Sequence, residues 1–487
     1  MNSFIPYTNL IIALPEIFLA LWLLIFIPLG VYSGGSLISR QSYFSFFSIL
    51  GLFGTFVILL LGDYEKATAF NDLIVLDKLV VYMKSLVLLS GILVFTISER
   101  YRSIEKLFIF EYPVLILFSI LGMLIMISSN DFITLYMGLE LQSLSLYVLA
   151  AMKKDSKNSS EAGLKYFILG AIASGFLLFG VSLIFGITGT TSFTNLSSIF
   201  SYTYVNPNQP LLVFAIIMIL SAMAFKISVA PFHMWTPDVY EGAPTSITAF
   251  FAVVPKIAAF AVLMRILFIA FYEVSFIWQQ ILIVMAILSI FVGAFGALLQ
   301  TSIKRLIAYS TISNVGYVLL SLSLASLAGL QSSIIYITIY TVTSLGVFAF
   351  ILSMEKDKIL LDKITSFSGL AKSNPFYALS FTIILLSLAG LPPLAGFFAK
   401  FYIFRALIIG DMLWIAVIGI FGSVISAYYY LKIIKIMYLD EPEDSLEINS
   451  NNYIKYVLGI CSLVIISFIF YADNLVELCI SLSKALV

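Results

Sequence analysis

Apolar runs of about twenty residues alternate with short polar segments along the whole chain. Because a helix of about twenty residues spans the hydrocarbon core of a bilayer, each run predicts a transmembrane helix. The pattern predicts an all-α polytopic membrane protein with about fourteen spans in a single membrane domain, residues 1–487. The spans are predicted at 10–31, 42–62, 74–97, 112–128, 131–152, 163–187, 211–235, 244–272, 275–299, 304–327, 331–354, 376–408, 411–438 and 453–472.

Composition supports a membrane protein. Hydrophobic residues make up 61% of the chain and charged residues only 11%, with a mean hydropathy of +1.08. This is more apolar material than a soluble core of 487 residues could bury. The first ten residues contain no basic residue and no cleavage motif, so we expect the first apolar run to be a retained helix rather than a signal peptide.

The basic residues indicate an orientation. When the connecting segments are numbered in order, most of the 26 basic residues lie in the odd-numbered segments or at their helix ends, and few lie in the even-numbered ones. The positive-inside rule then places the odd segments in the cytoplasm. An even number of spans puts both termini on the opposite, periplasmic side.

The seventh and twelfth predicted spans are interrupted by proline and glycine, in residues 224–237 (AFKISVAPFHMWTP) and 389–400 (AGLPPLAGFFAK). Since proline removes a backbone donor and collides with the preceding turn, we expect two discontinuous helices. Paired breaks are typical of transporters built from repeated halves, which predicts an inverted repeat of residues 112–272 and 275–438. Two unrelated proline kinks are the alternative.

Charged residues deep inside apolar spans are the main functional signal, because each costs about 2.5–3.5 kcal/mol at the bilayer centre on insertion scales. Such residues usually mark a pathway for charge. Burial disfavours the ammonium form of a lysine, whereas a neighbouring carboxylate favours it. The charged residues inside apolar spans are Lys84, Glu140, Lys226, Lys256 and Lys400. We predict that Glu140 pairs with Lys226, and that making and breaking this pair loads and unloads a proton.

Other interpretations of these charges stay open at this stage. Lys226, Lys256 and Lys400 could extend along the helix surface to the headgroups instead. A structural ion pair with a loop acid is as good an explanation of Lys84 as a functional role. His233, the single histidine, suits a proton relay but also suits packing at the interface.

Several function classes are excluded. A net charge of zero gives no basic patch for nucleic acid. Two cysteines, Cys461 and Cys479, cannot ligate an iron–sulfur cluster, and one histidine cannot supply a bis-histidine haem. The chain also has no nucleotide-binding glycine motif. We therefore expect no cofactor or metal to be bound by this chain.

Several motifs carry a family resemblance. Residues 233–245 (HMWTPDVYEGAPT), 254–258 (VPKIA), 138–147 (GLELQSLSLY) and 391–397 (LPPLAGF) closely resemble the antiporter-like N subunits of proton-translocating NADH:quinone oxidoreductase, respiratory complex I. The resemblance spans nearly the whole chain. Residues 236–245 (TPDVYEGAPT) separate the N type from related subunits and from cation/proton antiporters.

The resemblance implies a fourteen-helix antiporter-like fold in which Glu140 and Lys226 form the input pair of a proton relay. Lys256 is then the central residue, and Lys400 opens the path to the far side. Many relatives carry histidine or glutamine where this chain has Asn314. Because asparagine cannot titrate, a protonation step at this position is in doubt.

The resemblance also implies a membrane-arm subunit in the bacterial inner membrane, driven by redox events in neighbouring subunits. NADH, FMN, iron–sulfur clusters and quinone would all be bound by those partner subunits of the membrane and peripheral arms. The first alternative is a cation/proton antiporter, either stand-alone or part of a multi-subunit antiporter. The second is a structural scaffold whose lysines are packed ion pairs.

Overall fold

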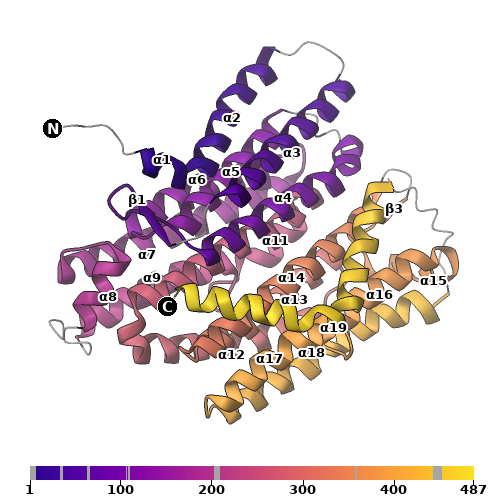
Figure 1. The fold of residues 1–487 in the computed structure, drawn as a ribbon. Coiled ribbons are helices and arrows are strands. Elements are labelled where there is room, and N and C mark those ends of the chain that lie inside the picture. Colours follow the sequence, from indigo (N-terminus) through magenta and orange to yellow (C-terminus); the bar gives the residue numbers. More distant parts are fainter. Residues whose placement is uncertain are drawn as a thin grey trace.

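A computed structural model describes residues 7–32, 37–62, 66–105, 107, 110–201, 209–356, 359–441 and 452–486. Helices dominate these ranges (Figure 1). Up to residue 274 the elements are α1 (Tyr7–Ile12), α2 (Leu14–Tyr32), α3 (Leu37–Leu61), β1 (Ala67–Ala69), β2 (Ile74–Leu76), α4 (Lys78–Ile104), α5 (Glu111–Ser128), α6 (Phe132–Ala150), α7 (Lys157–Thr188), α8 (Phe193–Ser201), α9 (Pro210–Ile227), α10 (Trp235–Gly242), α11 (Thr245–Arg265), the π-helix η1 (Ile266–Ala270) and the 3₁₀ turn η2 (Tyr272–Val274).

The second part of the chain continues in the same way, with helices joined by short connections. Its elements are α12 (Ser275–Leu298), α13 (Ile303–Leu322), α14 (Leu327–Ser353), β3 (Glu355–Lys356), β4 (Ile359–Leu360), the 3₁₀ turn η3 (Ile364–Phe367), α15 (Leu370–Ser373), α16 (Pro375–Ala389), α17 (Ala395–Ile409), α18 (Leu413–Leu439) and α19 (Asn452–Leu486). The strands form two antiparallel two-stranded hairpins, β1–β2 and β3–β4.

The chain is an all-α polytopic membrane protein, as predicted. Within the described ranges, 12 helices are long and apolar enough to cross a membrane. Each of the fourteen predicted ranges contains a helix. The other two predicted spans are the tenth and the twelfth. The tenth corresponds to α13, whose many hydroxyl and amide side chains lower its hydropathy. The twelfth corresponds to two shorter helices, α16 and α17, of 15 residues each. The exact number of membrane crossings stays a prediction.

Contacts between connecting segments agree with the predicted alternation of sides. Glu105 and Lys153, from the third and fifth connections, form an ion pair. On the other side, the backbone N–H of Asn130 in the fourth connection donates to the carbonyl of Leu73 in the second, over 2.9 Å. Odd connections thus meet odd ones, and even connections meet even ones, as an alternating chain requires.

Helices α4 and α11 lie antiparallel. At one end, Arg265 forms a buried ion pair of 2.7 Å with Asp77, which also caps α4 by accepting from the N–H of Val80. At the other end, the Thr245 N–H donates to the hydroxyl of Tyr101 over 3.1 Å. Arg265 and Asp77 therefore form a buried link between the two helices.

Several predicted boundaries were wrong, and two of them concern charged residues. The third predicted span began at residue 74, but residues 74–76 form β2 and α4 begins at Lys78, so Lys84 lies in the second turn rather than at the centre. The last span was predicted to end at residue 472, but α19 continues to Leu486. Charged residues such as Asp473 end the apolar run there, although the helix stays amphipathic and buries Cys479 and Leu482.

Helices α9 and α16 end inside the helical layer. After α9, Ser228 adopts a left-handed conformation with φ of 69°; after α16, Gly390 does so with φ of 87°. Each break has the same closing hydrogen bond, from Val229 N–H to Ala224 and from Leu391 N–H to Leu386. A proline follows three residues after each left-handed residue. The chain resumes as α10 and α17.

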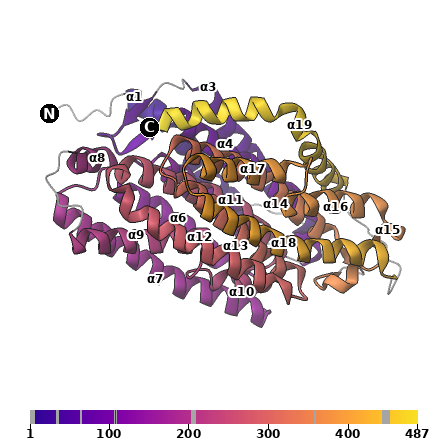
Figure 2. The ribbon, with the colours of Figure 1, turned by 90° about the horizontal axis from the view of Figure 1, so that it is seen from below.

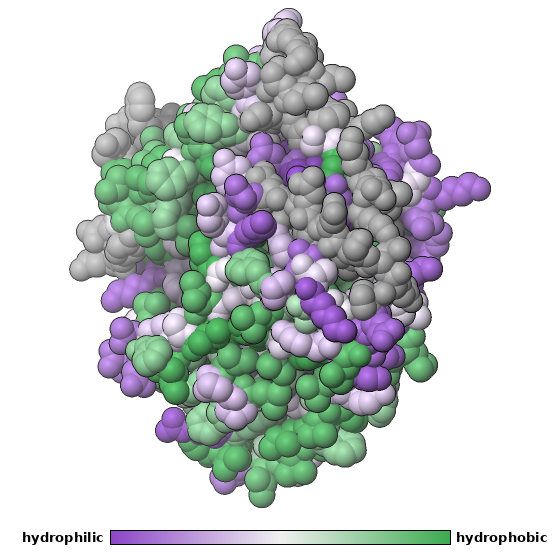
Figure 3. Space-filling model, turned by 90° about the vertical axis from the view of Figure 1, so that its right-hand side faces the viewer, coloured by the Kyte–Doolittle hydropathy of each residue, from purple (hydrophilic) through white to green (hydrophobic). Residues whose placement is uncertain are grey.

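The helices pack as one bundle, with α2 and α3 at one end and α17 and α18 at the other (Figure 1). Seen from below, α7 lies along α9 (Figure 2). The long helix α19 crosses α14, α4 and α16 (Figure 1). Hydrophobic side chains cover much of the face in Figure 3, and hydrophilic ones gather toward its right-hand edge. This surface fits an apolar surrounding rather than water. The acidic composition of residues 440–447 predicts a solvated loop, and this stretch lies mostly outside the described residues.

Candidate functional site

All four lysines singled out from the sequence are buried inside the protein. Their exposed fractions are 1% for Lys84, 8% for Lys226, 2% for Lys256 and 6% for Lys400. None of these side chains extends along the outer surface toward a headgroup region. The structure therefore contradicts the snorkelling interpretation.

Lys226 lies in the last turn of α9, immediately before the first break. Its ammonium donates to Ser143 Oγ over 2.8 Å and to the Tyr147 hydroxyl over 3.4 Å, both on α6. Gly170 of α7 makes room for this arrangement, because a side chain there would collide with the Tyr147 hydroxyl. Lys226 is thus held by neutral oxygen atoms rather than by a counter-ion.

Glu140 does not form the direct ion pair with Lys226 that the sequence suggested. Its carboxylate accepts a hydrogen bond from Ser174 of α7 instead. Glu140 sits on the outward side of α6, in line with Met137 and Leu144, which are 63% and 54% exposed. The direct pair is absent because Ser143 and Tyr147, one and two turns further along α6, occupy the position facing Lys226.

Lys400 lies in the second turn of α17, just beyond the second break. Its ammonium donates to the carbonyls of Leu388 and Ala389, each over 3.1 Å, and to Ser423 Oγ over 2.8 Å. The two carbonyls belong to the end of α16 and lost their helical partners at the break. The left-handed Gly390 lets the lysine approach, since a side chain there would meet its Cδ atom at 2.9 Å.

Lys256 lies within α11, a helix that is buried along its whole length. Its amine has no hydrogen-bond partner among the described residues, and it lies 5.6 Å from the centre of the Tyr240 ring. Ring contacts lead from there to Lys226: Tyr240 packs on Trp235, Trp235 on Tyr166, and Tyr166 on Tyr147. The two lysines are therefore separated by aromatic side chains.

His233 is half-buried in the first break, between α9 and α10. Its Nδ1 atom is buried without a hydrogen-bond partner in the part of the chain that the structure describes. A proton-relay role for His233 stays a prediction. Among the described residues, no three histidine, cysteine, aspartate or glutamate side chains are grouped as metal ligands.

Lys84 has a partner that the sequence did not indicate. It forms an ion pair with Glu16 in the first turn of α2, and Ser128 of α5 donates to the same carboxylate over 3.0 Å. The partner is thus a residue of the first apolar span, not the loop acid that was considered. The sequence signal that could have indicated this partner was Glu16 itself, an acidic residue near the start of an apolar run.

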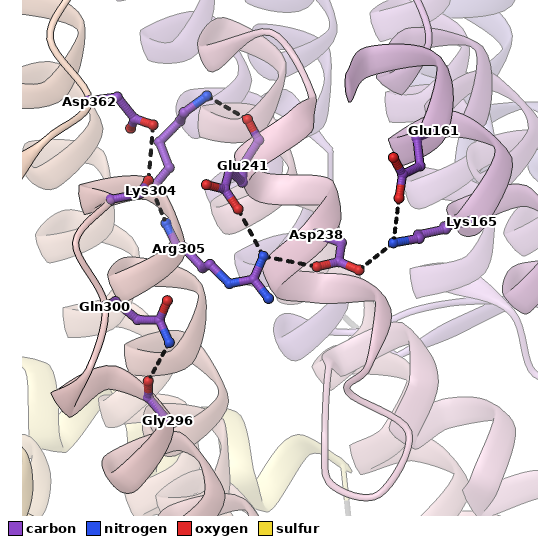
Figure 4. Close-up of polar contacts among 10 residues, drawn as sticks. Glu161, Lys165, Asp238, Glu241, Gly296, Gln300, Lys304, Arg305 and Asp362 are labelled. Atoms are coloured by element: carbon purple, nitrogen blue, oxygen red, sulfur yellow. Dashed lines mark hydrogen bonds and ion pairs between the residues drawn. The ribbon is translucent and has the colours of Figure 1, made fainter. Parts of the chain in front are cut away.

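A network of charges on the predicted cytoplasmic side was also missed (Figure 4). Lys165 of α7 pairs with Glu161 and with Asp238 of α10, each over 2.7 Å. Arg305 of α13 pairs with Asp238 over 3.0 Å and with Glu241 over 2.8 Å. The network borders an open pocket of about 230 Å³ and ties α7, α10 and α13 together.

Comparisons with known proteins agree with the family resemblance found in the sequence. The family model described as NADH:quinone oxidoreductase/Mrp antiporter, TM, matches residues 129–426. NADH-quinone oxidoreductase subunit N of Pelagibacter ubique is 45% identical over 471 residues, which make up 96% of this chain and 98% of that relative. The chain belongs to the NADH-quinone oxidoreductase subunit N family. This confirms the resemblance seen in residues 233–245.

Other members and solved structures agree. Subunit N of Bartonella bacilliformis is 46% identical over 471 residues, with 95% of each chain covered. A chain of respiratory complex I from Thermus thermophilus with bound aureothin matches with a TM-score of 0.80 at 28% identity, over 95% of this chain and 98% of that one. A chain of the Mrp complex from Dietzia sp. matches with a TM-score of 0.85 at 22% identity, over 98% of each chain, which shows a shared fold alone.

Proposed function

We propose that this chain translocates protons across a bacterial inner membrane as a membrane-arm subunit of NADH:quinone oxidoreductase. The proposed relay runs from Glu140 through Lys226 and Lys256 to Lys400. The proposal rests on one observation: these three lysines are buried, and none of them contacts a carboxylate within the part of the chain that the structure describes. Lysines that lack a fixed counter-ion can change protonation when a nearby charge changes.

The position of Glu140 supports an input from a neighbouring subunit. A carboxylate that faces lipid at membrane depth is costly. Glu140 lies on the outward side of α6 among exposed apolar residues, so a partner subunit that covers this face would remove the cost. A charge arriving from that partner would act on Lys226, which donates to Ser143 and Tyr147 one and two turns along α6 from Glu140.

The aromatic side chains between Lys226 and Lys256 suit an electrostatic step. Among the described residues, the side chains from Tyr147 to Tyr240 are joined by ring contacts rather than by a continuous chain of hydrogen bonds. In such a low-dielectric region one charge acts strongly on another over several ångströms. We infer that a charge on Lys226 favours proton release from Lys256 toward Lys400.

The second break gives Lys400 a suitable setting for the far end of the relay. The end of a helix carries a partial negative charge, and the freed carbonyls of Leu388 and Ala389 accept from the arriving ammonium. Release from Lys400 then requires those contacts to loosen. The interrupted helix therefore supplies the carbonyl acceptors for the Lys400 ammonium and the flexible backbone that lets these contacts loosen.

Similar construction in the two parts of the chain supports the predicted inverted repeat of residues 112–272 and 275–438. A side chain on Gly122 of α5 would collide with the backbone of Gly138 and Gln142 in α6. A side chain on Gly293 of α12 would collide in the same way with Tyr309 and Ser313 in α13. The two breaks also share their closing hydrogen bond.

The redox chemistry belongs to the partner subunits in this proposal. NADH, FMN, iron–sulfur clusters and quinone are bound there, and this chain only moves protons. Both termini lie on the periplasmic side. The rival function is a cation/proton antiporter that works without redox partners, and the fold it shares with the Mrp chain does not favour it.

Reconstitution distinguishes the two functions. The purified chain, placed in liposomes under a pH gradient with sodium or potassium, is expected to show no cation/proton exchange. The complex purified in mild detergent is expected to contain this chain with NADH-oxidising and quinone-reducing partners, and to pump protons when NADH and quinone are added. Exchange by the isolated chain, or its purification without such partners, would overturn the proposal.

A further inference from the structure

Two small cavities lie between Lys256 and Lys400. The first, next to Lys256, offers about 10 Å³ to the centre of a water molecule, and the second, next to Lys400, offers about 20 Å³. A single water needs about 10–15 Å³ measured in this way. Each cavity therefore has a size that suits about one water molecule.

The two cavities share part of their walls. Asn314 of α13 and Tyr336 and Tyr340 of α14 border both of them; Asn314 and Tyr336 are buried, and the Tyr340 hydroxyl donates to Thr311 over 3.2 Å. The Tyr336 hydroxyl donates to Asn314 Oδ1 over 3.0 Å, and the Asn314 amide donates to Ser310 Oγ over 3.3 Å. The Asn314–Tyr336 hydrogen bond thus lies at the boundary between the two cavities.

The Lys256 amine supplies independent evidence for a ligand in the first cavity. It lines that cavity and has no hydrogen-bond partner among the described residues. A buried amine without a partner is costly, and ordered water is the usual remedy. Lys400, in contrast, has three acceptors for its three N–H groups.

We propose that Tyr336 passes protons between one water bound beside Lys256 and one water bound beside Lys400, and that Asn314 orients the Tyr336 hydroxyl. This inference rests on the proposed relay and concerns its transfer from Lys256 to Lys400. An N–H bond of the Lys256 ammonium breaks, and an N–H bond forms on the neutral Lys400 amine. Each water and the hydroxyl gain one proton and lose another, so all three end unchanged.

The Asn314–Tyr336 hydrogen bond gives this step a closed state. While Tyr336 donates to Asn314, its proton is directed at neither water. The hydroxyl must turn away from Asn314 before a proton can pass. A side chain that cannot titrate is suited to this role because it holds the hydroxyl without itself storing the proton.

The test replaces Tyr336 with phenylalanine in the assembled complex in membrane vesicles. Loss of a proton-transferring group typically slows transfer strongly, so Tyr336→Phe is expected to lower quinone-coupled proton pumping by roughly tenfold or more. Tyr82→Phe is the matched control, because Tyr82 also hydrogen-bonds α14, over 2.8 Å to Thr338, yet borders neither cavity. The control is expected to pump normally.

A third variant separates this inference from the proposed function. Lys400→Met is expected to lower the number of protons pumped per electron pair, and an unchanged number in Lys400→Met would overturn the relay itself. If Lys400→Met lowers this number while Tyr336→Phe pumps as well as Tyr82→Phe, the relay stands and only the role of Tyr336 is overturned.

Asn314 is tested as a positioning residue by rescue. Asn314→Leu keeps the size but removes the amide that holds the hydroxyl in its closed state, and is expected to lower net pumping because protons can then leak back. Asn314→Gln retains an acceptor and is expected to recover part of the net pumping. Normal pumping by Asn314→Leu would overturn the positioning role. Should a variant fail to assemble, a map of the unmodified complex that resolves buried waters decides, since empty cavities would contradict the proposal.

Discussion

At the scale of single residues, the four buried lysines and Arg265 fall into two groups. Lys84 and Arg265 have carboxylate partners in direct contact, Glu16 and Asp77. Among the described residues, Lys226 and Lys400 donate hydrogen bonds to hydroxyl and carbonyl oxygens, and Lys256 has no hydrogen-bond partner. A fixed counter-ion keeps a lysine charged, so the first group suits structure and the second suits proton transfer.

We expect Lys84→Met to destabilise the protein by about 3–5 kcal/mol, because it leaves Glu16 as a buried carboxylate without a counter-ion. The double variant Glu16→Gln with Lys84→Met should recover most of this loss. Thermal unfolding of the purified complex measures the effect. Lys435→Met is the control; its 3.9 Å pair with Asp440 is exposed and should contribute about 0–1 kcal/mol. A double variant that assembles but fails to pump would instead place Lys84 in the relay.

Individual residues could be predicted only in part. Each of the lysines was found because a charge inside an apolar run stands out in the sequence, whichever way its side chain points. Their partners were not found, because Ser143, Tyr147 and Ser423 are ordinary residues whose significance depends on which helices meet. The expected Glu140–Lys226 pair failed for the same reason: a shared helix face does not determine which side chain reaches across.

At the scale of helices, close packing positions the relay. Tyr147 reaches Lys226 because Gly170 leaves space for its hydroxyl between α6 and α7. We expect Gly170→Ala to displace Tyr147 and to lower proton pumping by about tenfold, since a shift of about 1 Å in a reacting group can cost as much as a hundredfold. Pumping in vesicles, normalised to the amount of assembled complex, measures this.

Gly175→Ala is the matched control on the same helix, because a side chain there meets no atom within 4 Å. It should leave pumping unchanged. Equal behaviour of the two variants would show that the space beside Tyr147 is unimportant.

The charged network of α7, α10 and α13 leads to a salt-dependent prediction. Asp238→Asn removes the acid shared by Lys165 and Arg305, and should lower stability by about 1 kcal/mol or less, because these side chains are partly exposed. The loss should shrink as salt is added, since ions screen such pairs. Thermal inactivation at low and high salt measures it, with Glu161→Gln as a control that breaks one pair only. A loss that is independent of salt would contradict an electrostatic role.

Helix breaks were predictable and helix ends were not. Proline and glycine cannot be accommodated in a regular helix, so residues 224–237 and 389–400 gave a local signal for both interruptions. The full length of α19 was missed, because an amphipathic extension has no long apolar run. The start of α4 was misplaced because the apolar strand β2 precedes it.

At the scale of the whole molecule, the predicted orientation can be tested by labelling. We expect Lys484→Cys, near the end of α19, to react with an impermeant thiol reagent added from the periplasmic side. Lys154→Cys, in the connection between α6 and α7, should react only from the cytoplasmic side. Both lysines are exposed, and the native Cys461 and Cys479 are buried, so the background should be low. Labelling of both positions from one side would contradict the alternating arrangement.

In this protein, buried lysines carry protons in response to charge changes in their neighbours. The number of protons pumped per electron pair tests this role, in vesicles that contain the complex with Lys226→Ala or Lys256→Ala. We expect both variants to assemble and to pump fewer protons per electron pair than the unmodified complex. An unchanged ratio in both variants would show that these lysines do not carry protons.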